Sequence, residues 1–379
     1  MSIAIGATAS PAARAAAAEQ ALTAGRSEEA IALARALLDT APGDSRAWIW
    51  FGELLLRAHR PDEALAAYGR AAELNPGLAA SFTRQATILF RRAYGPPPRA
   101  RPAMSAARIQ GRFLGSDGRF GNQLLQYGFL RLCAQRYGLE LQVPDWIGRD
   151  LFEFDDPLPA ETLPLRRECD FDVSTVLCGA GAAVVTNVNI QGYFCGSMAR
   201  WGEVREPLRA VFRLGARLAP KVTRALEALR ARGATVIAVH LRRGDFGYGR
   251  FWIAPSSWFA RWLRDIWAGL DRPVLYVASD CAQVARELAE FQPVTAAELG
   301  IEIVGAPFLV DFEVLRNADL LAVSNSSFSF VAALLNTRAR TFVRPDPDLR
   351  RLRPMSPWSE PVLLDPTAAA GSAALRAGT

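Results

Sequence analysis

The fold is decided by one stretch of the chain, Thr235-Val236-Ile237-Ala238-Val239-His240-Leu241-Arg242-Arg243-Gly244-Asp245. Its first part, 235–241, is rich in branched apolar residues and predicts a buried strand. Further strands are predicted at Pro273–Ala278, Ile301–Val304 and Leu320–Val323, and helices between them at Ser257–Leu270, Ala282–Phe291 and Phe328–Leu335. Strands that alternate with helices predict βαβ units around a parallel sheet.

The charged residues that follow this strand form the first candidate site. Parallel α/β sheets place ligands at the carboxyl ends of their strands. Arg242 and Arg243 offer forked donors that match phosphate oxygens bidentately, a geometry that lysine does not reproduce. The alternative is a structural salt bridge between Asp245 and one of the arginines.

A glycine turn forms the second candidate site, at Asp117-Gly118-Arg119-Phe120-Gly121-Asn122-Gln123. Glycines on both sides of Arg119 let the backbone turn tightly and approach a ligand. A helical pattern over Leu124–Ala134 would leave Asn122 and Gln123 at its N-terminus, where free amides favour an anionic group. The alternative is a plain glycine turn capped by Asn122.

A run of hydroxyl residues forms the third candidate site, at Ser324-Asn325-Ser326-Ser327-Phe328-Ser329. It lies between a predicted strand and a predicted helix, so its hydroxyls and amides could cradle a phosphate or a ribose. The alternative is a serine N-cap, which would account for one serine but not for four.

The first part of the chain repeats itself. Glu28–Ala32 returns as Asp62–Ala66, and Pro42-Gly43 returns at the same offset as Pro76-Gly77. An alanine-rich helical pattern with a period of about 34 residues resembles the tetratricopeptide repeat. We expect helical repeats over 1–94 that dock a protein partner, with a generic helical hairpin as the alternative. A proline-rich linker over 95–112 should be extended.

Composition limits the classes of partner and cofactor. The 379 residues carry a net charge of +6, almost wholly from arginine, since Lys221 is the single lysine. The arginines are spread and not interleaved with aromatic residues, so no nucleic acid is expected. Five cysteines without a C-x-x-C pair and two histidines predict neither a disulfide framework nor a metal site. No apolar run approaches the ~20 residues of a membrane span, so we expect a bacterial cytoplasmic protein, free or peripheral to the inner membrane.

The three motifs together resemble glycosyltransferase family 11, the α-1,2-fucosyltransferases, and their wider fucosyltransferase relatives. Gln191-Gly192-Tyr193-Phe194 resembles the family's Gly-Tyr-Phe segment, and Ala278-Ser279-Asp280 resembles its Ser-Asp-Asp segment. Cys281 stands where the family has a second aspartate, which puts the completeness of that segment in doubt. The resemblance covers about residues 113–345.

The resemblance implies an α/β protein of GT-B-like architecture, with two Rossmann-type domains behind the repeats. Residues 113–234 would face the acceptor, 235–365 would hold the GDP-sugar, and 366–379 are expected to be a disordered tail. Asn122 would lie on the acceptor side. Arg242 looks like the arginine on the β-phosphate, and His240 sits where the family's histidine contacts the nucleotide. Asp311 resembles the carboxylate that reads guanine; the other nucleotide-binding candidates are Arg119, Gly121, Arg243, Ser326, Ser327 and Phe328.

The implied reaction is inverting transfer of fucose from GDP-fucose to a glycan hydroxyl. Arg242, with Arg243 or Arg119, would stabilise the charge on the leaving phosphate in place of a metal. The catalytic base is Asp117 or Asp245. Two alternatives stay open: the same site using another GDP-sugar, and a non-catalytic nucleotide-binding scaffold.

Overall fold

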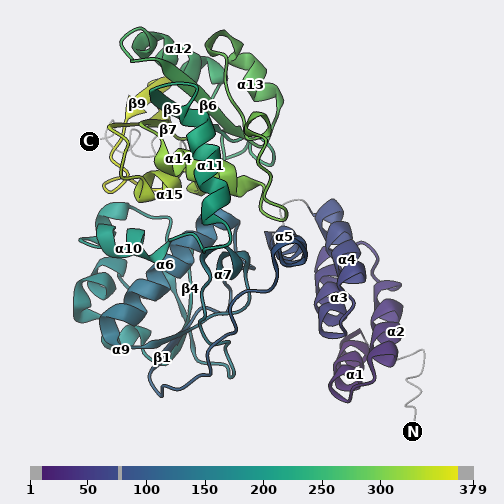
Figure 1. The fold of residues 1–379 in the computed structure, drawn as a ribbon. Coiled ribbons are helices and arrows are strands. Elements are labelled where there is room, and N and C mark those ends of the chain that lie inside the picture. The colour runs from purple at the N-terminus through teal and green to yellow at the C-terminus, as the bar shows by residue number, and fades with distance from the viewer. Residues whose placement is uncertain (1–10, 76–78, 366–379) are drawn as a thin grey trace, which may run out of the picture.

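A computed structural model describes residues 11–75 and 79–365, so the expected tail and the Pro76-Gly77 repeat pair lie outside the described residues. The chain begins with helices that pair in antiparallel hairpins: α1 (Pro11–Thr23), α2 (Ser27–Leu38), α3 (Ser45–Arg57) and α4 (Pro61–Leu74). Helix α3 repeats α1, and α4 repeats α2, at the same spacing along the chain. This spacing matches the period seen in the sequence. These helices share a small core of their own, and Figure 1 shows them standing to one side of the rest.

The first lobe, residues 108–211, is built on a parallel sheet in the order β2-β1-β4-β3. Helix α6 (Phe120–Tyr137) connects β1 to β2 and is buried along most of its length. The strands are β1 (Arg108–Gln110), β2 (Glu140–Gln142), β3 (Leu165–Arg167) and β4 (Val188–Gln191). The remaining helices are α7 (Ile147–Phe152), α8 (Val173–Thr175), α9 (Ala182–Val185) and α10 (Arg205–Val211).

The second lobe, residues 219–354, is built on a five-stranded sheet in the order β6-β5-β7-β8-β9. All neighbours are parallel except β8 and β9. The strands are β5 (Thr235–Leu241), β6 (Pro273–Ser279), β7 (Leu320–Ala322), β8 (Thr341–Asp346) and β9 (Arg351–Pro354). Helices α11 (Ala219–Arg230), α12 (Ser256–Trp267), α13 (Gln283–Glu287), α14 (Phe308–Asn317) and α15 (Ser327–Leu335) cover it. Two parallel α/β lobes behind helical repeats confirm the predicted fold class (Figure 1).

Most predicted elements of the second lobe are found, but the strand predicted at Ile301–Val304 is wrong. This segment is irregular, and Ile303 is fully buried. The adjacent Gly305, at φ +76°, lies so close to helix α5 (Ala79–Tyr94) that a Cβ there would come within 2.4 Å of the Phe90 amide nitrogen. Ile303 is therefore apolar because it lies in the core that the lobes share, and not because the segment joins a sheet.

Helix α5 belongs to the lobes as much as to the repeats. Its Phe90 is fully buried in the core that spans both lobes, and Arg91 pairs with Asp145 at 2.5 Å and Asp150 at 2.9 Å. The Arg217 guanidinium donates to the carbonyl oxygens of residues 94–96 at the end of the helix and just beyond it. The extended segment that follows leads into strand β1, which lies inside the range 95–112 expected to be a linker. Helix α5 therefore packs against α4 of the repeats as well as α7 of the first lobe, so it joins the two parts, and the stretch expected to be a linker is attached to the lobes.

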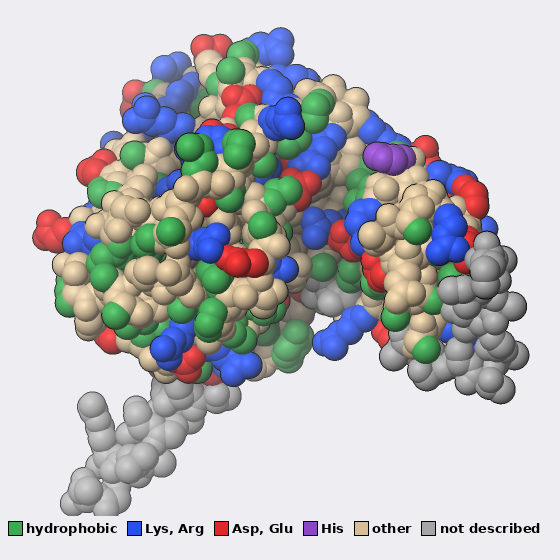
Figure 2. Space-filling view, turned by 90° about the horizontal axis from the view of Figure 1, so that it is seen from below, with side chains coloured by type: hydrophobic (Ala, Val, Ile, Leu, Met, Phe, Trp, Pro, Cys, Tyr) green, Lys and Arg blue, Asp and Glu red, His purple; other side chains and the backbone are tan. Residues whose placement is uncertain are grey.

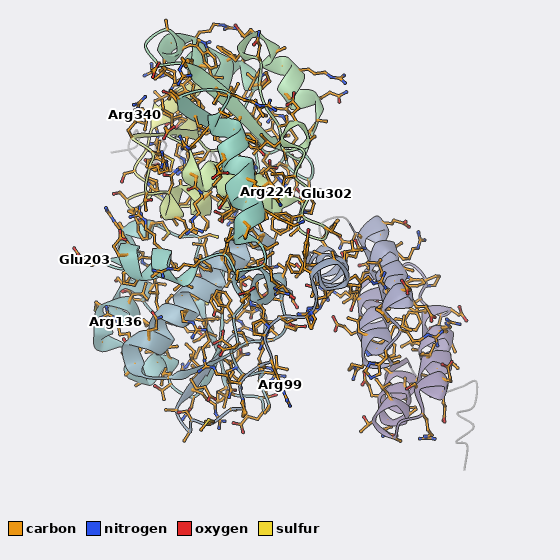
Figure 3. The ribbon with its side chains drawn as sticks, in the orientation of Figure 1. Arg99, Arg136, Glu203, Arg224, Glu302 and Arg340 are labelled. Atoms are coloured by element: carbon orange, nitrogen blue, oxygen red, sulfur yellow. The ribbon has the colours of Figure 1, made fainter. Side chains whose placement is uncertain are left out.

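The lobes also differ from the expected boundaries at residues 113 and 235. Strand β1 lies at the centre of the first sheet, and helix α11 packs against α14 and β5 of the second lobe. Sequence reasoning missed both elements because each is short or polar on one face. Charged side chains of both signs are spread over the surface, as the space-filling view and the labelled arginines Arg99, Arg136, Arg224 and Arg340 show (Figures 2 and 3).

Candidate functional site

The candidate site lies at the carboxyl edge of the second sheet. Strands β5 and β7 are adjacent and parallel, so His240, at the end of β5, meets the hydroxyl run that follows β7. Its Nδ1 lies 2.7 Å from Ser324 Oγ and 2.8 Å from Ser329 Oγ. Burial, with Arg242 and Arg243 nearby, lowers the pKa of His240 to about 3, so the ring is neutral at physiological pH. The structure places this histidine beneath the surface of the site, tying two of the motifs together.

Arg242 lies directly beyond β5 and is held by two carboxylates. Its Nη2 donates to Asp245 Oδ1 at 2.5 Å, and its Nη1 pairs with Asp280 Oδ2 at 2.9 Å. Asp280 also accepts the Arg243 backbone N–H at 2.8 Å. The salt bridge weighed as an alternative in the sequence is therefore present. A phosphate could reach Arg242 by exchanging with one of these carboxylates.

Arg119 brings the first lobe to the same place. Its Nη2 lies 3.3 Å from Asp245 Oδ2, and its guanidinium lies over the ring of Phe82 in helix α5, 5.0 Å from the centroid. Burial, and then the positive charge of Arg242, lowers the pKa of Arg119 from its ordinary value. Arg119 thus joins Arg242 at Asp245, and Asp280 is the second carboxylate held by Arg242. Arg243 follows Arg242 in the chain, and its charge is partly compensated by Asp280 and by Glu287. Such a cluster suits a phosphate group.

The glycine turn positions the lobes against each other. Helix α6 begins at Phe120, earlier than predicted, with Arg119 as its N-cap, so Asn122 lies within the first turn and is not the cap. A Cβ at Gly121 would lie 2.5 Å from the Phe328 amide nitrogen, so glycine here permits the N-termini of α6 and α15 to meet. The sequence predicted that glycine here lets the backbone approach a ligand. In the structure, Gly121 instead approaches the backbone of the other lobe. It brings two helix N-termini, both favourable for anions, to one point.

The hydroxyl run has several structural duties. Ser326 is the N-cap of α15 and accepts the Phe328 N–H at 3.4 Å. Ser324 and Ser329 bind His240, as described above. Ser327 and Phe328 are half-buried. The centroid of the Phe328 ring lies 5.3 Å from that of His240 and 5.5 Å from that of Phe312. Ser327, which is half-buried, is the serine of the run whose side chain these contacts leave to meet a ligand.

Asp311 lies in the first turn of α14, on the side that faces the sheet. Its Oδ1 accepts the hydroxyl of the fully buried Tyr276 at 2.6 Å. Burial raises the pKa of Asp311 to about 6 and that of Tyr276 well above its ordinary value. The sequence did not single out Tyr276, because a tyrosine in a buried strand reads as core.

The acceptor-side candidates lie on the first lobe. Asp117 Oδ2 accepts the Gln191 side-chain amide at 2.9 Å, and the half-exposed Tyr193 is near enough that Asp117, after burial, raises its pKa. Asn122 Oδ1 lies 3.6 Å from Cys195 Sγ. The turn itself is fixed, because the side-chain amide of Gln123 donates to the Gly118 carbonyl. Asp117 and Asn122 are thus brought to one surface beside Tyr193.

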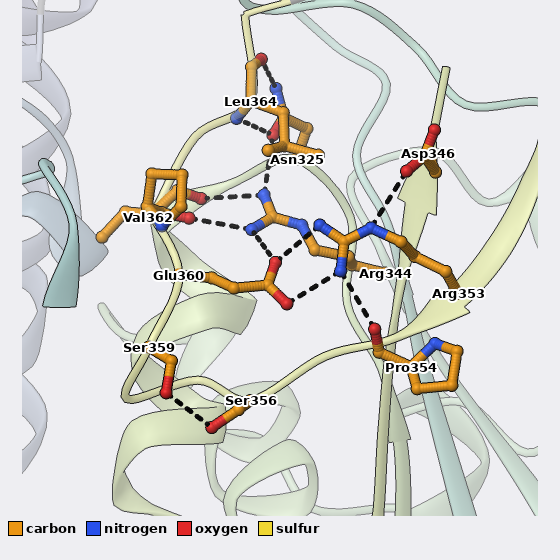
Figure 4. A network of polar contacts seen from close by, with 11 residues as sticks. Asn325, Arg344, Asp346, Arg353, Pro354, Ser356, Ser359, Glu360, Val362 and Leu364 are labelled. Atoms are coloured by element: carbon orange, nitrogen blue, oxygen red, sulfur yellow. Dashed lines mark hydrogen bonds and ion pairs between the residues drawn. The ribbon is translucent and has the colours of Figure 1, made fainter. Parts of the chain in front are cut away.

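Asp280 lies in a family-like segment of the sequence but was assigned no role there, and Phe82 was not singled out. Asp280 follows β6 as Asp245 follows β5, so the sheet-edge pattern that selected Asp245 could have selected Asp280 too. No local signal marks Phe82, which comes from a repeat helix. The fully buried Arg344 supports the segment that leads into α15 (Figure 4). Its Nη2 contacts Asn325 Oδ1 at 3.3 Å, and its Nη1 donates to the Pro361 carbonyl. This network ties the segment 355–365 to the start of α15.

Within the described residues, no three His, Cys, Asp or Glu side chains come together as a metal site would require. No helix in the same part of the chain is long and apolar enough to cross a membrane.

Comparison with known proteins identifies the repeats. Residues 21–84 match the tetratricopeptide-repeat family, which confirms that part of the sequence interpretation. No curated protein matches the chain. Glycosyltransferase family 11 itself is not confirmed.

Solved structures similar to the chain include fucosyltransferases. The α-1,6-fucosyltransferase NodZ soaked with GDP-fucose is 17% identical, covers 67% of this chain and 97% of its own, and gives a TM-score of 0.40. POFUT1 in complex with GDP-fucose is 14% identical, covers 65% of this chain and 99% of its own, and gives 0.41. An O-GlcNAc transferase mutant from Thermobaculum terrenum is 14% identical, covers 89% of this chain and 51% of its own, and gives 0.19. The chain is therefore a tetratricopeptide-repeat module, matched over residues 21–84, followed by two parallel-sheet lobes.

Proposed function

We propose that the protein is an inverting glycosyltransferase that moves fucose from GDP-fucose to a glycan hydroxyl, with α-1,2 linkage as the specific expectation. The observation that carries the proposal is that Arg119 and Arg242 share Asp245, close to where the N-termini of α6 and α15 meet. Arg119 comes from the first lobe and Arg242 from the second, so a diphosphate bound here would contact both lobes. The order of the three sequence motifs supports the choice of a GDP-sugar.

In the proposed reaction the acceptor oxygen attacks the anomeric carbon from the face opposite the phosphate. The bond between that carbon and the β-phosphate oxygen breaks, and its electron pair stays on GDP. The arginines stabilise this charge, as preorganised donors do in transition states of this kind. The acceptor's proton passes to a carboxylate.

Asp117 is the better supported base of the two candidates. Both oxygens of Asp245 face guanidinium groups, Oδ1 at Arg242 and Oδ2 at Arg119. Asp117 instead accepts one amide hydrogen bond and lies next to Tyr193 on the acceptor-side surface. Asp245 then serves to orient the two arginines.

Asp311 is proposed to read guanine, since a carboxylate can accept two N–H bonds from guanine and adenine cannot offer that pair. Calorimetry with GDP and UDP tests this: we expect GDP to bind and UDP to bind at least tenfold more weakly. Equal affinity would remove the guanine assignment. A donor screen with GDP-fucose and GDP-mannose would then separate the fucosyl reaction from transfer of another sugar, and GDP binding without any turnover would favour the scaffold.

A further inference from the structure

One residue of the proposed phosphate site comes from the repeat region. Helix α5 reaches the start of α6, where Phe82 lies 40% exposed with its ring under the Arg119 guanidinium. An arginine over an aromatic face is attracted by the ring quadrupole. The Arg119 head also pairs with Asp245, at the long distance of 3.3 Å. The ring face and this carboxylate therefore hold the guanidinium together.

The turn that carries Arg119 is fastened to the same helix. The Gln123 side-chain amide donates to Thr83 Oγ1 in α5 at 3.0 Å and to the Gly118 carbonyl at 2.9 Å. A second glutamine of α6, Gln126, donates to the Asp117 carbonyl at 2.9 Å. The backbone before Arg119 is thus held by α6, and Gln123 ties this turn to α5, the element that carries the ring.

Helix α5 can act as such an element because it is anchored on the lobes. Thr83 and Thr87 are buried, Phe90 is fully buried, and Arg91 bridges to Asp150. Phe82 stays partly exposed beside this buried surface, so its ring face is open to the Arg119 guanidinium while the rest of the helix is held by the lobes.

We propose that Phe82 is a positioning residue that orients the Arg119 guanidinium for the β-phosphate of the donor, so that a helix of the repeat region completes the donor site. This inference rests on the proposed function. The aromatic face of Phe82, and not merely its apolar bulk, would orient the guanidinium.

Three variants of the full chain separate these roles. Phe82→Leu keeps apolar volume but removes the ring face, Phe82→Tyr keeps the face, and Arg92→Ala is a matched control on the exposed side of α5, where Arg92 pairs with Asp62. The measurements are kcat and KM with GDP-fucose, the affinities for GDP and for GMP, which lacks the β-phosphate, and the unfolding midpoint.

We expect Phe82→Leu to lower kcat about tenfold, within the range of a partly desolvated cation–π contact. Its GDP affinity should fall severalfold while its GMP affinity stays unchanged, and Phe82→Tyr and Arg92→Ala should behave like the wild type. Phe82→Leu with wild-type kcat and an unchanged ratio of GDP to GMP affinity would overturn the inference, as would equal weakening of both nucleotides. A wild-type chain that binds no GDP would instead overturn the proposed function, and this inference with it.

Discussion

Replacing Arg242 by lysine tests whether its forked guanidinium acts on the donor phosphate or only pairs with carboxylates. The Arg242 side chain is 16% exposed and reaches Asp245 and Asp280 with different nitrogens. A lysine ammonium keeps the charge but cannot span both carboxylates in the same geometry. The structure therefore predicts effects on stability and on rate that can be measured separately.

The expected loss of stability follows from the lost contact. One charge-assisted hydrogen bond out of two should disappear, which costs about 1.5–3 kcal/mol of unfolding free energy. If the fork also contacts the leaving phosphate in the transition state, turnover should fall about a hundredfold, the consequence of losing about 3 kcal/mol of preorganised stabilisation. GDP affinity should fall much less, because a contact made mainly in the transition state acts on kcat.

Asp280→Asn is the matched control. It removes the charge of one Arg242 partner but leaves the guanidinium in place, so it should cost comparable stability while turnover falls less than tenfold. The assay is kcat with GDP-fucose, GDP affinity by calorimetry and the unfolding midpoint, all on one preparation. A stable Arg242→Lys protein with near-normal turnover, or one whose loss of turnover only equals that of Asp280→Asn, would refute a direct role for the fork.

Three further outcomes are expected. Asp311, with its pKa raised to about 6, loses folding stability as pH rises from about 4 through 6; Asp311→Asn should therefore gain about 1–3 kcal/mol over the wild type at pH 8, little at pH 3.5, and bind GDP more weakly. A stability gain that did not depend on pH would count against that assignment. Turnover should persist in EDTA, and loss of activity that magnesium or manganese restores would contradict the proposed metal-independent reaction. Deleting residues 1–75 should leave a folded, GDP-binding protein. Deleting 1–100 should not, because it empties the core site of Phe90 and leaves the buried Asp150 without Arg91; circular dichroism and calorimetry on both truncations decide this.

Local pattern was enough to predict the parallel sheet of the second lobe and the helical repeats, whereas the two-lobed architecture was implied by the family resemblance. The buried strand at 235–241 is found with the predicted bounds, because seven consecutive buried positions leave the same apolar signature whatever surrounds them. The repeats were likewise visible, since a fixed sequence period is a property of the chain itself. The placement of Arg242 and of the hydroxyl run at strand ends follows from a general rule of parallel sheets.

The tertiary structure alone decided which of those residues meet and what each one touches. His240 contacts serines far away in the sequence, Gly121 packs against the backbone of the other lobe, and Ile303 is buried in a core rather than in a strand. Phe82 reaches Arg119 from a helix that the sequence groups with the repeats. Periodicity records whether a side chain is covered but not by what, because the free energy of burying an apolar group depends on the area removed from water and hardly on the partner that covers it.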